Sequence, residues 1–415
     1  MLFIYGALSV GGIETFFVRM AKQRHKNNLK TKIILLSEKK DSNSELLTEM
    51  LRYAEVYFVS DVFYELGFIS KKLHLLAPIK NDVIYDLLYD VDHVHVTHGA
   101  HALLALRFLE YTDKKIYITV GFYHSKEFSW GDPSNLPYYE RKNREFIFKA
   151  LPKRNIYLFS ESLITLYKNL LGVDLTGAKT FRIGVIERVQ TKSYSTKSDF
   201  ENLKICSVGR LVDFKTYNLW MLDVVKKFVI DGFPIEYHIY GTGPLSTLIN
   251  ERIANLQLEK YVMLKGGLDY SQFENTVSRY DLFVGSGTSI IQASSLGVCS
   301  IIAIESNQEP TSYGFFHENC HFDYNFEHPK INKFPVIELI KEYIHMGNEE
   351  KKFLSIQHIN AVEPFFMDSC SVNFDDIDLL EYQEKIKYSK ILYTITYLIK
   401  KLKVKLKIDS IYHSF

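Results

Sequence analysis

Short apolar runs alternate with amphipathic helical patterns along most of the chain. Apolar runs of this length are typical of strands that a parallel sheet buries on both faces. The strand-like runs lie at residues 2–5, 33–36, 56–59, 94–97, 116–120 and 156–159, and then at 205–208, 235–240, 262–264, 282–284 and 300–304. Alternation of such strands with helices predicts an α/β fold with parallel sheets covered on both sides.

A polar interval rich in Ser, Thr and Lys separates the two series of strands. Because 415 residues is long for one domain, we interpret the interval as a linker between two doubly wound α/β domains. We place the N-terminal domain at residues 1–188, the linker at 189–202 and the C-terminal domain at 203–365. Residues 366–415 lack the alternation and end in a basic helical segment.

The charges nearly cancel, with 50 Lys and Arg against 49 Asp and Glu and a net charge of +1. We therefore expect no nucleic-acid partner. The first apolar run has no basic region before it, which argues against a signal peptide, and no run reaches the about 18 apolar residues of a membrane span. The four cysteines, without C-x-x-C spacing, are Cys206, Cys299, Cys320 and Cys370. We expect free thiols and a cytoplasmic protein.

Two cations follow the first strand of the C-terminal domain. Residues 207–215 read S-V-G-R-L-V-D-F-K, so Arg210 and Lys215 lie in a glycine turn between a strand and a helical pattern. In α/β proteins, such a turn is where a ligand binds. Arg binds phosphate oxygens bidentately and Lys adds a compact charge, so the pair suits a diphosphate, although solvated surface cations are also common here.

Glycine-rich turns follow other strands. Residues 8–14 read L-S-V-G-G-I-E before an apolar helical face, which suits an anion at a helix N-terminus, although an ordinary tight turn also fits. In the C-terminal domain, G-T-G-P begins at residue 241, K-G-G at 265 and G-S-G-T-S at 285. We expect free amides at Gly287, Thr288 and Ser289, at the start of a helix, where they suit phosphate.

These segments resemble, in the same order, those of glycosyltransferase family 4, which carries the G-R-L-x-x-x-K turn. The resemblance implies the GT-B fold, with two Rossmann-like domains facing across a cleft and a C-terminal crossover helix. It implies transfer of a sugar from a nucleotide sugar to an acceptor hydroxyl, with retention and without a metal or other cofactor. It implies a donor diphosphate on Arg210, Lys215, Gly11, Gly12, Gly287, Thr288 and Ser289, the ribose on Gln292, and nucleotide-side loops at Gly241, Gly243 and Gly266.

One loop departs from the family's pattern. The family carries paired glutamates eight positions apart, where this chain has Val284 and Gln292. Val284 cannot accept a hydrogen bond from the donor sugar, and Gln292 can bind ribose hydroxyls only without charge assistance. Some branches of the family lack the first Glu, so a transferase remains the main hypothesis. The alternatives are a non-catalytic protein that binds sugar nucleotides and a nucleotide-sugar epimerase.

Histidines follow two strands of the N-terminal domain. His93 and His95 share one strand face, which is compatible with a metal pair, but the sequence offers no matching set of carboxylates. His98 follows that strand and is expected to line the cleft, as Glu14 is by resemblance. The resemblance makes His124 the catalytic histidine near the transferred sugar, although a loop histidine is also commonly structural.

The tail is basic and amphipathic. Residues 384–408 hold eight lysines and one acid. On a helix, one apolar stripe would contain Tyr388, Ile391, Ile395, Leu398, Leu402 and Leu406. Such a helix suits an anionic membrane surface, whereas packing on the N-terminal domain or an edge strand at 402–408 are alternatives. Membrane contact favours a lipid-linked glycan acceptor, bacterial surface polysaccharide synthesis, and a peripheral position on the inner face of the plasma membrane.

Overall fold

The computed structural model describes residues 1–124, 127–188, 202–321, 324–326, 331–375, 378–382 and 386–406. The chain divides into two compact units. Unit 1 comprises Met1–Ile183 and Cys370–Phe415, and unit 2 comprises Gly184–Ser369. Most of the predicted linker, residues 189–201, lies outside the described residues.

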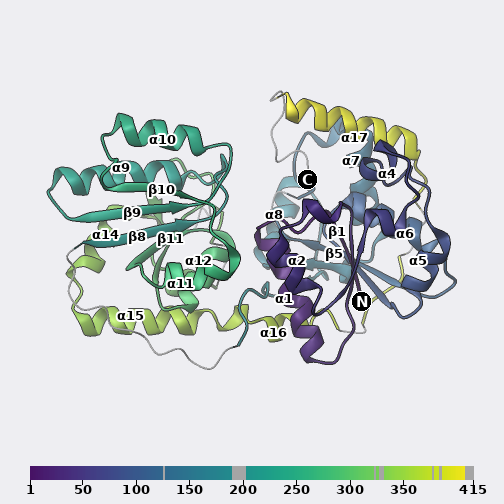
Figure 1. The fold of residues 1–415 in the computed structure, drawn as a ribbon, viewed down its shortest axis with the longest axis horizontal. Helices are drawn as coiled ribbons and strands as arrows, with labels where there is room; N and C mark the ends of the chain where they lie inside the picture. Colours follow the sequence, from purple (N-terminus) through teal and green to yellow (C-terminus); the bar gives the residue numbers. More distant parts are fainter. Residues whose placement is uncertain are drawn as a thin grey trace. The chain divides into compact units, whose positions relative to one another are not determined.

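A parallel sheet forms the middle layer of unit 1 (Figure 1). Its strand order is β3-β2-β1-β4-β5-β6-β7, and each neighbouring pair is parallel. The residues of β1, β2 and β4 are all buried because both faces are covered, as their apolar runs predict. The strands are β1 (Leu2–Tyr5), β2 (Lys32–Leu35), β3 (Glu55–Phe58), β4 (His93–Val96), β5 (Tyr117–Phe122), β6 (Ile156–Leu158) and β7 (Lys179–Thr180).

Helices connect these strands and share one apolar core with them. The helices of unit 1 are α1 (Gly12–Lys26), α2 (Ser44–Met50), α3 (Val59–Val62), α4 (Phe68–Lys72), α5 (Asn81–Leu88), α6 (Gly99–Leu109), α7 (Tyr138–Glu145), α8 (Ser162–Leu171) and α17 (Lys390–Lys405). Short 3₁₀ or π turns occupy Lys39–Asp41, Pro133–Asn135, Phe146–Ala150 and Lys153–Asn155.

Unit 2 repeats this plan around a second core and a parallel sheet of order β10-β9-β8-β11-β12. Its strands are β8 (Leu203–Val208), β9 (Ile235–Tyr240), β10 (Val262–Gly266), β11 (Leu282–Gly285) and β12 (Cys299–Ile302), with a small antiparallel pair β13 (Thr311–Ser312) and β14 (Phe334–Pro335). Its helices are α9 (Tyr217–Ile230), α10 (Ser246–Asn255), α11 (Phe273–Val277), α12 (Gly287–Ser295), α13 (Phe316–Asn319), α14 (Val336–His345) and α15 (Asn348–Ala361). The 3₁₀ turns Tyr270–Gln272 and Glu363–Phe365 also belong to unit 2, and the helix α16 (Met367–Ser371) begins in unit 2 and ends in unit 1.

Each sheet reverses its direction of growth beside its first strand. The reversal lies between β1 and β4 in unit 1 and between β8 and β11 in unit 2. Loops leaving such neighbouring strands run to opposite faces of the sheet, which opens a crevice at the carboxyl ends of the strands. The predicted motifs lie in these loops, so the fold fixes one candidate ligand site in each unit.

The last described helix, α17, packs on α7 within unit 1. The Tyr393 hydroxyl donates to Asn143 Oδ1 at 2.8 Å, and the Tyr139 amide donates to Thr396 Oγ1 at 3.2 Å. Tyr393 is fully buried, so this contact anchors the helix by apolar burial as well as by hydrogen bonds. The helix α17 is therefore part of unit 1.

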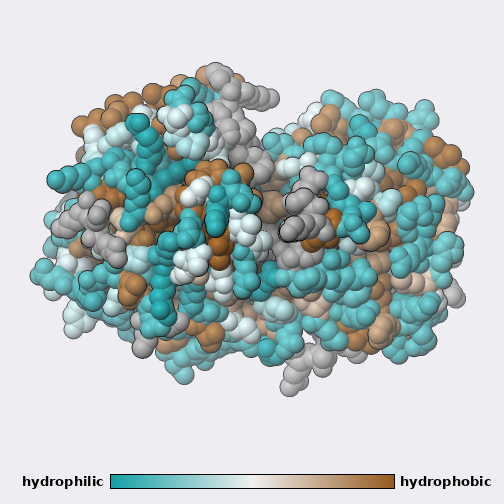
Figure 2. All heavy atoms as spheres, turned by 180° about the vertical axis from the view of Figure 1, so that it is seen from behind, coloured by the Kyte–Doolittle hydropathy of each residue, from teal (hydrophilic) through white to brown (hydrophobic). Residues whose placement is uncertain are grey.

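The packed face of α17 is not the apolar stripe that the sequence predicts. Thr394 and Lys400 are buried beside Tyr393. The residues that are 44–64% exposed are Ile391, Leu392, Ile395, Ile399, Leu402 and Leu406. Figure 2 shows apolar atoms gathered along the edge where α17 lies. The edge-strand alternative is wrong for its described part, because the helix continues to Lys405.

None of the described helices combines the length and the apolar character that a membrane crossing requires. The four cysteines are free thiols; Cys320 is half-buried and the other three are buried.

Candidate functional site

The loop after β8 brings the two predicted cations to the crevice of unit 2. Its first residue, Gly209, donates its amide to the Tyr240 carbonyl at the end of β9, at 2.9 Å. A Cβ placed on Gly209 would lie 2.6 Å from Lys215 Nζ, so the ammonium sits directly over the glycine backbone. Arg210 is exposed on the same loop. Both cations therefore stand at the carboxyl end of the central strand.

Glycines in the β9 loop let two backbones approach closely. A Cβ on Gly241 would lie 1.9 Å from the Gly209 carbonyl oxygen, and a Cβ on Gly243 would lie 2.3 Å from that of Leu211. The Gly241 amide donates to the Gly266 carbonyl at the end of β10, at 2.7 Å. Because the neighbouring backbone fills the space of a side chain, these positions require glycine. Two of the predicted nucleotide-side glycines, Gly241 and Gly243, therefore hold the β8 and β9 loops close together.

Two side chains from later in unit 2 form hydrogen bonds with the first residue of α12. The Gly287 amide donates to Asn325 Oδ1 at 2.6 Å, and its carbonyl accepts from the Tyr324 hydroxyl at 3.0 Å. The expectation of a free amide is therefore wrong at Gly287, whose φ of 67° favours glycine for a conformational reason. Thr288 and Ser289 follow, half-buried, on the first turn of the helix.

A carboxylate that the sequence analysis missed lies at this loop. Glu305 follows β12 and accepts a hydrogen bond from the Ser286 hydroxyl at 3.2 Å. The next amide, that of Ser306, donates to the Phe214 carbonyl in the β8 loop at 2.7 Å. The loops after β8, β11 and β12 therefore meet. The available signal was the place of Glu305 just after a strand, at the sheet edge where ligands bind. Gln292 is half-buried further along α12.

In unit 1, a carboxylate occupies the N-terminus of α1. Glu14 accepts hydrogen bonds from the hydroxyls of Ser9 at 2.7 Å and Tyr5 at 3.3 Å. A Cβ on Gly11 would lie 2.4 Å from Glu14 Oε2, so the carboxylate folds back over the Gly11–Gly12 turn. A negative charge already satisfies the helix dipole there. This geometry disfavours a phosphate at Gly11 and Gly12 and favours a ligand hydroxyl that donates to Glu14.

His98 forms a hydrogen-bonded pair with Glu127 after the strands β4 and β5 of unit 1. His98 Nδ1 donates to Glu127 Oε1 at 2.8 Å, and the two side chains are 22% and 3% exposed. Burial raises the pKa of the Glu127 carboxyl, and the hydrogen bond from His98 opposes that rise. The His98 ring stacks on Tyr5, with 6.2 Å between centroids, which connects the pair to Glu14. The pair orients the imidazole with Nε2 turned away from Glu127.

The predicted catalytic residue His124 lies in the turn after β5. Its carbonyl accepts the Glu127 amide at 3.1 Å, and its side chain is half-buried. Residues 125 and 126 lie outside the described part of the chain. Glu127 thus joins the two candidate histidines, His98 through its side chain and His124 through the backbone.

His93 and His95 are core residues. His95 Nδ1 lies 2.8 Å from Thr119 Oγ1 and its Nε2 lies 3.0 Å from the Tyr123 hydroxyl oxygen, while His93 Nε2 contacts the same threonine. Burial lowers the pKa of His95 to about 3, so its ring is neutral. Among the described residues, no group of three or more His, Cys, Asp or Glu is arranged to hold a metal ion.

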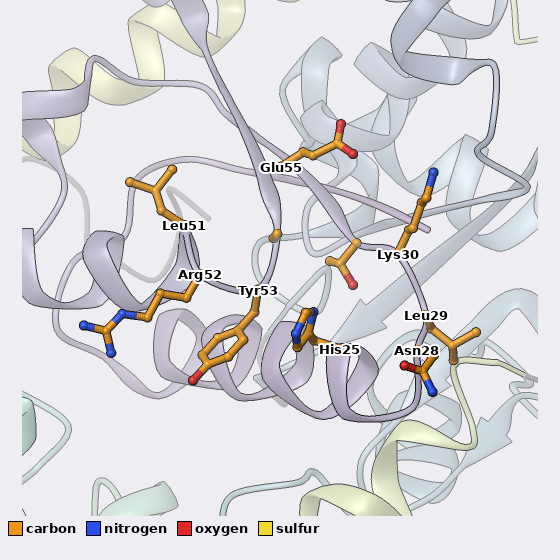
Figure 3. Close-up of a pocket in the computed structure, with 10 residues that line it drawn as sticks. His25, Asn28, Leu29, Lys30, Leu51, Arg52, Tyr53 and Glu55 are labelled. Atoms are coloured by element: carbon orange, nitrogen blue, oxygen red, sulfur yellow. The ribbon is translucent and has the colours of Figure 1, made fainter.

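A shallow cavity of about 400 Å³ lies at the end of the unit 1 sheet opposite to His98 and Glu127. Figure 3 shows its lining, with His25 on α1, Tyr53 before β3, and Lys30 before β2. These residues stand at the amino ends of the strands, away from the crevice. The cavity is therefore separate from the candidate site.

The sequence matches no known family profile and no curated protein. Its fold, however, is similar to that of solved structures. A glycosyltransferase from Rickettsia africae is 15% identical, with a TM-score of 0.60, covering 98% of this chain and 99% of its own. Anabaena HepE in complex with UDP and glucose is 13% identical, with a TM-score of 0.60 and coverages of 90% and 98%. Sucrose-phosphate synthase from Thermosynechococcus elongatus is 11% identical, with a TM-score of 0.60 and coverages of 90% and 97%. The predicted GT-B fold is thus confirmed, whereas family 4 stays a prediction.

The close approach at Gly241 makes a testable prediction. We expect Gly241→Ala to lower the free energy of unfolding of unit 2 by about 2 kcal/mol or more, because its Cβ would overlap the Gly209 carbonyl. Gly267→Ala is the matched control, since its nearest neighbour would lie at 3.8 Å. Chemical denaturation measures both, and equal stabilities would contradict the described loop pair.

Proposed function

We propose that the protein is a retaining glycosyltransferase of family 4, which moves a sugar from a nucleoside-diphosphate sugar to an acceptor hydroxyl. The observation that carries the proposal is the placement of Arg210 and Lys215 at the point where the unit 2 sheet reverses direction. The shared fold supports it, and the Anabaena protein of this fold carries UDP and glucose.

The donor diphosphate is assigned to unit 2. Arg210 binds its oxygens through the guanidinium fork, and Lys215, held over Gly209, adds a second positive charge. The first-turn amides of Thr288 and Ser289 face the same end of the sheet and add the dipole of α12. These groups offset the charge that develops on the leaving diphosphate, so the proposal needs no metal.

Glu305 is assigned to the donor sugar. The family's first glutamate position is the buried Val284, which offers no acceptor side chain. Glu305 brings a carboxylate to the neighbouring Ser286 from β12 instead. A carboxylate there accepts charge-assisted hydrogen bonds from sugar hydroxyls. This supports an active transferase over the non-catalytic alternative.

The acceptor side is assigned to unit 1. Glu14 offers a carboxylate to a hydroxyl at the N-terminus of α1, and the oriented His98 ring lies beside it through Tyr5. A neutral imidazole that donates through Nδ1 carries an Nε2 that accepts a proton. His98, with Glu127 as its positioning residue, therefore joins His124 as a candidate for activating or orienting the acceptor hydroxyl.

The donor assignment predicts ligand-dependent stability. In a thermal-shift screen of UDP, GDP, ADP, CMP and their sugars, one diphosphate at 100 times its Kd is expected to stabilise the protein by about 2.7 kcal/mol. Arg210→Ala is expected to lose the shift, whereas Arg279→Ala, an exposed arginine elsewhere in unit 2, is expected to keep it. Stabilisation by none of these ligands would contradict the proposal.

The acceptor assignment predicts a split between turnover and donor binding. His98→Ala and His124→Ala are each expected to lower kcat about 100-fold or more, because general-base or hydroxyl-positioning contacts contribute that much. The donor-induced thermal shift, which reports unit 2, is expected to remain. Steady-state kinetics with the donor found above measures this, and a histidine whose replacement leaves kcat unchanged is not part of the site.

The acceptor context is also proposed. We assign the protein to the cytoplasmic face of the plasma membrane, acting on a glycan or lipid-linked glycan in bacterial surface polysaccharide synthesis. The exposed apolar side chains of α17 lie among Lys401, Lys403 and Lys405, which suits an anionic lipid surface. Each such lysine contributes about 1 kcal/mol near that surface.

This assignment predicts that apolar residues of α17 drive vesicle binding. Sedimentation with phosphatidylglycerol vesicles is expected to fall strongly for Ile395→Asp and Leu402→Asp, because both side chains would enter the lipid interface. The matched control is Leu248→Asp, another exposed apolar residue, which lies on α10 in unit 2. Equal sedimentation of all three variants and the wild type would remove the membrane from the proposal.

A further inference from the structure

A second cavity in unit 1, of about 220 Å³, lies between α4, α6 and α17. Its lining includes Lys71, Lys72, His74, His101 and Lys401. The cavity also touches Gly6, which follows β1, and therefore lies next to the crevice of unit 1. Its volume is below the roughly 300–1,000 Å³ typical of sites that enclose a whole drug-sized ligand. It suits a small charged group better than a nucleotide sugar.

The charged side chains of this lining are all lysines. Lys72 and Lys401 reach the cavity from α4 and α17, and Lys401 lies 4.6 Å from the Tyr397 ring centroid. Lys71 differs, because it pairs with Glu38 beside the cavity. Lys72 and Lys401 are therefore the cations whose charge a ligand would meet first.

Two histidines of this lining each have a buried ring nitrogen without a partner among the described residues, namely His74 Nε2 and His101 Nδ1. Both rings are fixed in place. The His74 ring stacks on Phe63, at 5.7 Å between centroids, and the His101 ring lies 5.1 Å from that of His98. Burial, together with the nearby Lys401, lowers the pKa of both histidines, that of His74 to about 4. An unsatisfied buried nitrogen costs stability unless a ligand or water bonds to it.

We propose that this cavity binds a phosphate group of the acceptor, so that the acceptor is a phosphorylated or diphosphate-linked glycan. Lys72 and Lys401 supply the charge, and His74 and His101 supply hydrogen bonds. The contact of His101 with His98 places the phosphate beside the hydroxyl site, and α17 contributes both a wall of the cavity and the exposed apolar face. This inference deepens the proposed function. The assignment of the phosphate to the acceptor rests on that function, whereas the anion site itself does not.

The test uses inorganic pyrophosphate and the full chain carrying Arg210→Ala, which removes the donor arginine. Calorimetric titration at pH 6 in two buffers of different ionisation enthalpy reads affinity and proton uptake together. We expect binding with proton uptake, because a bound anion raises the pKa of His74 and His101 from below the working pH. Adding Lys72→Ala and Lys401→Ala is expected to weaken the affinity at least tenfold and to abolish the uptake.

The matched control is Lys403→Ala, which removes the same charge from α17 at a position outside the cavity lining. It is expected to leave the titration unchanged. A second arm compares phosphatidylcholine vesicles with and without phosphatidic acid. If the lysine pair matters only for phosphatidic acid, the phosphate belongs to a lipid headgroup; if it matters for pyrophosphate, a soluble phosphate suffices.

If the Lys72→Ala/Lys401→Ala variant binds both pyrophosphate and phosphatidic acid vesicles as well as its parent does, the proposal is overturned. The donor screen uses no phosphate acceptor and this titration uses no nucleotide sugar, so the two can fail separately. In an otherwise wild-type background, Lys72→Ala/Lys401→Ala is also expected to retain the donor-induced thermal shift of unit 2, which separates a lost site from a misfolded chain.

Discussion

The structure depends on how closely backbones approach at the carboxyl ends of the central strands. In unit 2, the Gly209 carbonyl occupies the space where a side chain on Gly241 would lie. Only glycine permits this contact, and it brings the β8 and β9 loops together under the cations. The sheet reverses beside the same strand, which is where a ligand crevice is expected in a sheet of this kind.

The two units have the same parallel-sheet architecture, but their candidate sites carry side chains of opposite charge. The unit 2 crevice carries Arg210 and Lys215, which suits a diphosphate. In the unit 1 crevice, Glu14 and the His98–Glu127 pair hold carboxylates and an oriented imidazole, which suit hydroxyl groups. The basic cavity next to it is lined by α17, whose other side is apolar and exposed. This arrangement supports the proposal of an enzyme whose acceptor is both hydroxylated and anionic.

The sequence predicts the central strands well because they are short apolar runs buried on both faces, as at residues 2–5 and 282–284. It also places the candidate ligand-binding residues in loops that follow strands, where α/β proteins bind ligands. It does not predict contacts between distant residues, such as Asn325 on the Gly287 amide or Glu305 on Ser286. The sequence also does not predict which face of α17 packs, because Tyr393 and the exposed leucines and isoleucines are all apolar. The position of α7 determines which of these residues are buried.

We propose that a nucleoside diphosphate binds where the β8, β11 and β12 loops meet. The most direct measurement is a crystal structure of the protein grown with UDP, GDP and ADP in turn. We expect a diphosphate within hydrogen-bond distance of Arg210 and Lys215, with its terminal phosphate toward the first turn of α12. A diphosphate bound instead at the Gly11–Gly12 turn of unit 1, or absent from the β8 loop with all three nucleotides, would contradict it.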